Sequence, residues 1–243
     1  RIYLLMINKK LFILILAILL TGLAFMFSQY SIFVKNSSKK TQVLIHPDKF
    51  FDENTFYNGI EWARKESKPF SYRVLGGIIP HHLFPSFLIA DFFARLPSSI
   101  KTVILIGPNH NERGNFKALT SILGWQTPFG TTLPDEIIIK ELIKNNLVKI
   151  DEEILPNDHA VAGIIPFVKY YLPDAKVVPI LLSGFMKQEE VALLANNLKN
   201  YIDEETIVVT PVDFSHYLTN SEAAEKDRVS LEVIKDFDFR KLF

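Results

Sequence analysis

The chain has 243 residues, 48% of them hydrophobic, so it can bury a full core and fits one α/β domain with an appendage. Its 27 basic and 27 acidic residues balance, and the absence of a basic stripe argues against a nucleic-acid-binding surface. Cysteine is absent, which excludes disulfides, thiolate zinc sites and a cysteine nucleophile.

The N-terminus carries a hydrophobic leader. Residues 11–27 hold no charge, two lysines precede them, and a polar linker follows at residues 36–40. This length borders on the about 20 residues that a membrane-spanning helix needs, and no small-residue cleavage signature follows, so an anchor is favoured over a cleaved signal peptide. We expect residues 1–40 to form a hydrophobic signal-anchor helix with its linker, and the body to lie outside the cytoplasm. That body, residues 41–243, ends inside an amphipathic pattern, so we expect it to be C-terminally incomplete.

The body alternates between strand and helix patterns. Apolar runs bounded by turn residues predict strands, and apolar residues three or four apart predict helices. The predicted strands are 74–79, 103–106, 118–123, 176–182 and 207–209. The predicted helices are 51–65, one beginning near Pro85, 135–145, 160–172, 188–201 and one from Ser221 onward. This alternation predicts an α/β fold in which a mostly parallel sheet is flanked by helices.

Two helices have apolar stripes that define an expected buried face. The helix near Pro85 is expected to bury Phe87, Leu88, Phe92 and Leu96. The last helix is expected to turn Val229, Val233 and Phe237 inward.

Three predicted strands end in the same way, with a proline shortly before a histidine. The histidines are His81, His110 and His216. Side chains at the carboxyl ends of neighbouring parallel strands converge on one crevice, where such folds bind ligands. A neutral imidazole is the commonest protein metal ligand. The sequence therefore predicts a metal centre at this edge of the sheet.

Two further residues near this edge have alternative roles. His159 opens the predicted helix 160–172, where the positive end of the helix dipole favours a neutral imidazole. It is expected to be a ligand, an acid–base group or a helix cap. Asp213 is expected either to accept the ring N–H of His216 or to cap the last helix.

The remaining two histidines are not expected to belong to the metal centre. His82 follows His81 directly, so in an extended backbone its side chain points the other way. His46 has no companion in the sequence and is expected on the surface.

Taken in order, several short blocks of the body resemble the Memo family, also called AmmeMemoRadiSam system protein B. The blocks lie at residues 79–81, 106–110, 127–130, 158–159, 178–180 and 213–216. The family is similar in structure to class III extradiol dioxygenases of the LigB type, in which histidines bind a non-haem metal at the sheet edge. The resemblance implies that His81 and His110 are metal ligands and that Ser215, where some members have cysteine, is the third. His159 and His216 are the catalytic candidates beside them.

The implied cofactor is a divalent metal, with iron or copper ahead of zinc, and the implied function is that of a non-haem oxidoreductase of dioxygenase type. The family's His-Ser-x-Glu reads His159-Ala-Val-Ala162 here, so a glutamate is missing. That loss favours the first alternative, a membrane-tethered, non-catalytic binding module. A metallohydrolase is the second, because a metal-bound water needs only the same ligands and a base. A small-molecule substrate and a protein partner fit these hypotheses, and nucleic acid does not.

Overall fold

The computed structural model describes residues 45–238. The predicted anchor and linker, residues 1–40, lie outside the described residues. Within residues 45–238, no helix combines the length and the apolar character that crossing a membrane requires.

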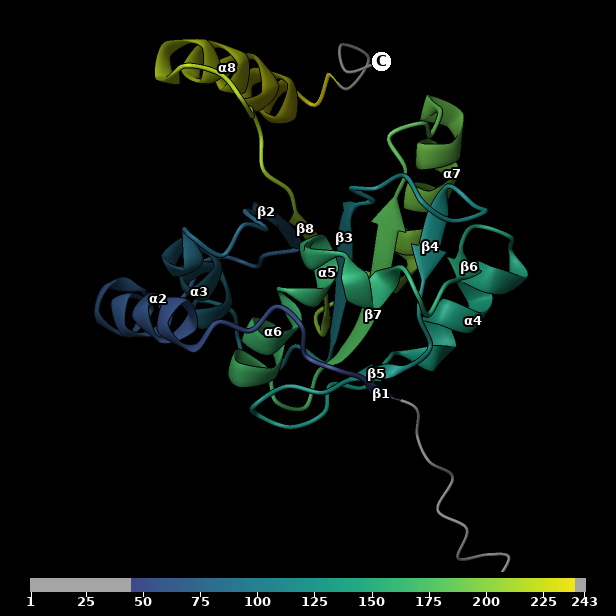
Figure 1. Cartoon of the computed structure of the whole chain (residues 1–243), viewed down its shortest axis with the longest axis horizontal. Helices are drawn as coiled ribbons and strands as arrows, with labels where there is room; N and C mark the ends of the chain where they lie inside the picture. Colours follow the sequence, from purple (N-terminus) through teal and green to yellow (C-terminus); the bar gives the residue numbers. More distant parts are fainter. Residues whose placement is uncertain (1–44, 239–243) are drawn as a thin grey trace, which may run out of the picture. The chain divides into compact units, whose positions relative to one another are not determined.

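Six strands form the main sheet (Figure 1). They are β2 (Gly76–Ile79), β3 (Thr102–Pro108), β4 (Ala118–Thr120), β6 (Lys149–Ile150), β7 (Lys176–Leu182) and β8 (Thr206–Pro211). Their order is β2-β8-β3-β7-β4-β6, and every pair is parallel except β4 with β7. The prediction of a mostly parallel sheet is confirmed. The three strands expected to end in histidine segments, β2, β8 and β3, are consecutive neighbours in it.

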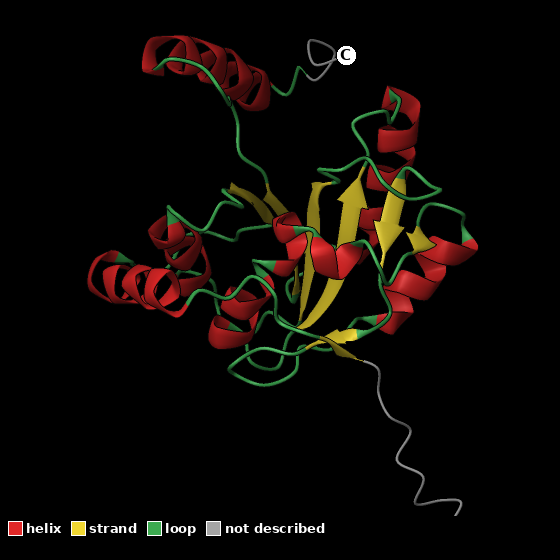
Figure 2. Ribbon diagram, viewed as in Figure 1, coloured by secondary structure: helices red, strands yellow, loops and turns green. Residues whose placement is uncertain are grey.

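Helices cover both faces of this sheet (Figure 2). They are α2 (Glu53–Glu66), α3 (Ser86–Ala94), α4 (Glu136–Lys144), α5 (His159–Ala162), α6 (Ile165–Tyr171) and α7 (Gln188–Leu198), with short 3-10 turns η1 (Leu155–Asn157) and η2 (Lys199–Tyr201). The last helix, α8 (Asn220–Asp236), contributes no residue to the core on either face. Val103 and Leu105 of β3 pack in one core with α2, α3, α5 and α6, whereas Ile104 packs in a second core with α4 and α7. Alternate side chains of one strand thus serve opposite faces, as the pleat requires.

A second, two-stranded sheet joins the N-terminal end of the described chain to the body. Its strands, β1 (Ile45–His46) and β5 (Gly124–Trp125), run parallel, and Ile45 pairs with Gly124. The backbone N–H of Gln126 donates to the carbonyl of His46 over 2.8 Å, which extends this pairing by one bond.

The helix predicted over residues 160–172 is divided in two. α5 ends at Ala162, with Gly163 as its C-cap, and α6 begins at Ile165, with Pro166 in the first turn of α6. Proline lacks the N–H that would continue the ladder and clashes with the preceding turn, so a single helix cannot run through this point.

Both predicted apolar stripes were partly wrong. In α3, Ile89, Ala90 and Phe93 are buried, whereas Phe87 and Leu88 are exposed. Phe87 instead packs on Trp62 of α2, with ring centroids 5.2 Å apart. In α8, only Val233 of the three expected residues is buried, and Val229 and Phe237 are exposed. α3 is apolar almost all round, so periodicity alone could not select the face that packs on the body.

Candidate metal centre

Three histidines from different elements converge at the carboxyl edge of the main sheet. His81 lies two residues beyond β2, His110 two residues beyond β3, and His159 is the first residue of α5. One ring nitrogen from each lies within 4.8 Å of the other two, a spacing that could hold a metal ion. The Nε2 atoms of His81 and His110 are 3.2 Å apart. His110 and His159 are stacked, with ring centroids 4.2 Å apart.

Glycine in β3 allows α5 to reach this edge. A Cβ on Gly107 would lie 2.8 Å from the Cβ of Ala160 and 3.4 Å from Cγ2 of Val161. Any larger residue would push α5 away from the strand, because real Cβ contacts are not that short. The close approach therefore places His159, at the start of α5, beside His110 at the end of β3.

Hydrogen bonds orient two of the three rings. Nδ1 of His110 lies 2.8 Å from Oδ1 of Asp158, and Nδ1 of His81 lies 3.3 Å from the carbonyl oxygen of Pro211. Carboxylate and carbonyl oxygens only accept, so each Nδ1 carries the hydrogen and each Nε2 presents a lone pair. Two lone pairs 3.2 Å apart repel unless a cation or a proton lies between them. This donor set therefore fits a bound metal ion.

Burial favours the neutral, metal-binding form of His81 and His159. It lowers the pKa of His81 and of His159, and the neighbouring histidines lower both further. Asp213 and Asp158 act in the opposite direction on His81 without reversing the shift. Imidazole must be neutral to bind a metal, so these lowered pKa values favour the ligand form at neutral pH.

Asp158 is the site residue that sequence reasoning missed. Its side chain is buried, its Oδ2 accepts from the backbone N–H of His110 over 2.9 Å, and its Oδ1 accepts from the N–H of Ala160 over 3.0 Å. It thus caps α5 and holds the ring and the backbone of His110 at once. An aspartate directly before a predicted helix is a sequence signal for a cap. Nothing in the sequence links it to a histidine 48 residues away.

The segment after β8 lies beside the three histidines. Oδ1 of Asp213 accepts from the backbone N–H of His81 over 3.1 Å, and Oδ2 lies 3.6 Å from Nε2 of His81 and 4.0 Å from Nε2 of His216. Asp213 is therefore directed at His81. The cap of α8 is Thr219, so the capping role considered for Asp213 was wrong.

Two predicted site residues are not brought into the histidine group. His216 is half exposed and reaches the group only through Asp213. The hydroxyl of Ser215 donates to Oδ1 of Asp227 in α8 over 2.7 Å, and its backbone N–H donates to the same oxygen. The structure thus places His159 with His81 and His110, and directs the Ser215 hydroxyl to α8.

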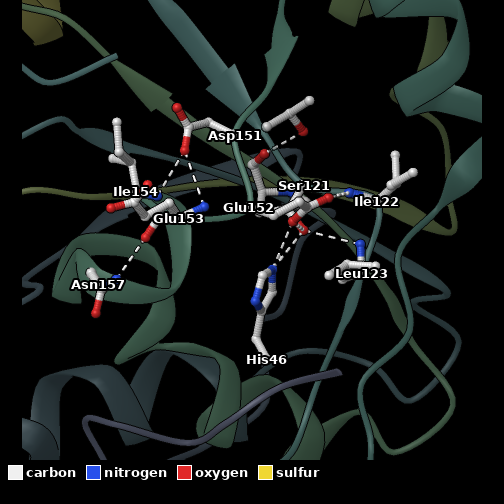
Figure 3. A network of polar contacts seen from close by, with 11 residues as sticks. His46, Ser121, Ile122, Leu123, Asp151, Glu152, Glu153, Ile154 and Asn157 are labelled. Atoms are coloured by element: carbon white, nitrogen blue, oxygen red, sulfur yellow. Dashed lines mark hydrogen bonds and ion pairs between the residues drawn. The ribbon is translucent and has the colours of Figure 1, made fainter. Parts of the chain in front are cut away.

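The two histidines expected to lie outside the metal centre differ in their burial. His82 is exposed and outside the group, in agreement with its expected orientation. The surface position expected for His46 was wrong, because its side chain is buried. Figure 3 shows why: Nε2 of His46 points at Glu152 and Ser121, at 2.8 Å and 2.9 Å. Its ring also packs on Trp125, with centroids 4.6 Å apart.

The chain is similar to proteins of one family over most of its length. A family model described as Memo-like protein matches residues 51–243. Curated relatives named MEMO1 family protein, from Sulfurisphaera tokodaii and Saccharolobus solfataricus, are each 28% identical over 177 residues, which cover 68% of this chain and 62% of the relative. One from Sulfolobus acidocaldarius is 29% identical over 176 residues, covering 68% and 61%. The chain thus matches less than two thirds of the length of these relatives, and it belongs to the Memo family.

Proposed function

We propose that this protein is a metal-dependent enzyme whose metal is held by His81, His110 and His159. The observation that carries the proposal is the convergence of three imidazole nitrogens within 4.8 Å, two of them with their Nδ1 hydrogens already engaged. Imidazole ligands suit iron, copper and zinc, and we favour iron or copper. Such an ion, when bound, supplies open coordination positions for dioxygen and an oxidisable substrate, which is the chemistry of a non-haem oxidoreductase of dioxygenase type.

The residues around the ligands have separable tasks. Asp158 and the carbonyl of Pro211 hold two imidazoles with Nε2 facing inward. Outer hydrogen bonds of this kind fix the tautomer and raise the basicity of a metal-binding histidine. His216 is half exposed, with Nε2 4.0 Å from Oδ2 of Asp213, and we assign it the role of proton donor or acceptor toward the substrate.

A metallohydrolase is the competing proposal. It would use the same three ligands, with Asp213 or His216 as the base that takes a proton from water. The nearby Asp213–His216 pair is the observation that keeps this alternative open. A third hypothesis, a binding module with a structural metal, predicts the same ligands and no turnover.

Metal analysis of the purified full chain tests the proposal first. We expect about one ion per chain in the parent and in His82→Ala, and almost none in His110→Ala, since His82 lies outside the histidine group. Oxygen consumption with catechol-type substrates then tests the dioxygenase assignment, and hydrolysis of activated esters tests the competitor. Equal metal content in parent and His110→Ala would contradict the proposal.

Membrane attachment remains a separate proposal that rests on the uncharged residues 11–27. Extraction of membranes with alkaline carbonate is the measurement. We expect the full-length chain to stay in the pellet, with the body on the extracytoplasmic side. Full-length chain in the supernatant would contradict the anchor.

A further inference from the structure

The residues just before the family-matched region form a strap across the body. We call Ile45–Phe50 the strap; the family match begins at the next residue, Phe51. The first two residues of the strap form β1, which pairs with β5, and the ring of His46 packs on Trp125.

The strap contacts the segment that delivers His159 at three successive points. His46 Nε2 lies 2.8 Å from Oε2 of Glu152, and Lys49 Nζ donates to Oδ1 of Asn157 over 2.7 Å. The rings of Phe50 and His159 then lie 6.1 Å apart between centroids. The contacts follow the same order along both segments, so the strap runs alongside residues 152–159 in the same direction.

Phe50 also meets α5 one turn beyond His159. A Cβ on Gly163 would lie 3.8 Å from the Cβ of Phe50. His159 and Gly163 are four residues apart, so they lie on the same face of this short helical turn. Phe50 therefore packs on the face of α5 that carries the His159 ring.

The segment under the strap has little local structure of its own. η1 spans three residues and α5 four, and helices this short are not stable without tertiary contacts. The side chain of Asp158 caps α5, and Gly107 lets α5 pack closely on β3. The strap adds contacts to α5 from the N-terminal end of the described chain. The direction of the His159 side chain thus depends on contacts from outside its own segment.

We propose that the strap is a positioning element for the metal centre, with Lys49 and Phe50 acting on the metal through His159. This inference rests on the proposed function for its metal readout, and on the strap contacts alone for its structural readout. It assigns a role to residues outside the Memo match, so the geometry of the third ligand is set partly by a part of the chain that the family match does not include.

Binding of Co²⁺ to the full chain is the first test, because its visible spectrum reports the number and geometry of its ligands. We expect Lys49→Met and Phe50→Ala each to weaken Co²⁺ binding by about tenfold or more, within the range seen for residues that orient ligands, and to shift the spectrum toward that of His159→Ala. Lys65→Met is the matched control: Lys65 forms a similar exposed bond, 2.7 Å to Glu61, away from the segment 152–159. It should leave the affinity and the spectrum unchanged.

A double variant shows whether the strap acts through His159. Once His159→Ala has removed the ring, adding Phe50→Ala should cause no further loss of Co²⁺ affinity. An equal further loss would overturn the inference, because the strap would then act on the site by another route. Unchanged affinity and spectrum in both single variants would overturn it as well.

Hydrogen exchange of the metal-free chain tests the strap independently of the metal. We expect faster exchange of the amides at residues 155–163 in Lys49→Met and Phe50→Ala, but not in Lys65→Met. If the parent binds no Co²⁺ and exchange still rises, the proposed function fails and the strap contact is upheld. If exchange is unchanged, the strap inference fails whether or not the metal binds.

Discussion

Two partly buried histidine–carboxylate contacts have the same length and serve different ends. Nδ1 of His110 lies 2.8 Å from Asp158, and Nε2 of His46 lies 2.8 Å from Glu152. In His110 the remaining nitrogen faces two other imidazoles, whereas the ring of His46 packs on Trp125. The comparison teaches that a short contact to a carboxylate does not by itself mark a metal site. The groups around the other ring nitrogen decide whether the histidine can bind a metal.

The largest effect should come from removing a ring at the three-histidine edge. His81→Ala or His110→Ala should abolish stoichiometric metal binding, because two imidazoles cannot hold the ion that three hold. His46→Gln, the corresponding change at the other contact, should keep the full stoichiometry at saturating metal and lower the melting temperature instead. Metal content by mass spectrometry and thermal unfolding of the three variants separate these outcomes. If His46→Gln bound less metal per chain than the parent, the His46 contact would also be part of the metal site.

A smaller effect is expected from the carboxylate that orients His110. Asp158→Asn keeps the shape but loses one acceptor, so metal affinity should fall about 10–100-fold while the ligands remain. Asp135→Asn is the matched control, since Asp135 is also a buried cap, accepting from Ile138 in α4 and from Thr102. Both variants should unfold at lower temperature, and only the first should bind metal more weakly. Competition titration with a chromogenic chelator measures this.

The close approach of α5 to β3 offers a purely steric test. Gly107→Ala should cost about 1–3 kcal/mol of unfolding free energy, as overpacking usually does, and weaken metal binding by moving His159. Ala160→Gly in the same chain removes the methyl group that the new Cβ would meet, 2.8 Å away. The double variant should therefore bind metal more tightly than Gly107→Ala alone. No recovery in metal titration would show that the helix is held by other contacts.

The smallest effect concerns the pH dependence of the His46 contact. Burial alone would raise the pKa of Glu152, but hydrogen bonds from His46, Ser121 and the N–H of Ile122 outweigh it and hold the pKa below its usual range. A carboxyl group whose pKa is lowered on folding stabilises the fold above its unfolded pKa of about 4.3 and loses that contribution as pH falls through the folded value.

Glu152→Gln should therefore flatten the fall in melting temperature between pH 6 and pH 3, because the amide does not titrate. Glu153→Gln, an exposed neighbour, is the control and should keep the slope of the parent. If the melting temperature of Glu152→Gln fell with pH as steeply as that of the parent, this carboxylate would contribute little to acid unfolding.

Much of the fold could be predicted from local patterns. Apolar runs bounded by turn residues located β3, β7 and β8 to within three residues at each end. Their alternation with helices predicted parallel pairing, since such crossovers allow little else. Two site residues, His81 and His110, followed from the same logic, because a proline beyond an apolar strand marks where the strand stops and the next side chains meet the sheet edge.

What the sequence by itself determined was thus five of the six strands of the main sheet, their mostly parallel pairing and the convergence of two histidines at their ends, all consequences of local periodicity and chain stereochemistry. The tertiary structure alone decided the rest of the site. His159 joins the group because Gly107 admits α5, Asp158 orients a ring 48 residues away, and Ser215 is drawn to Asp227. His46 is buried because its partners, Glu152 and Ser121, arrive from distant segments. Which particular residues meet across the sequence depends on how the elements pack, and no local pattern in the chain records those pairs.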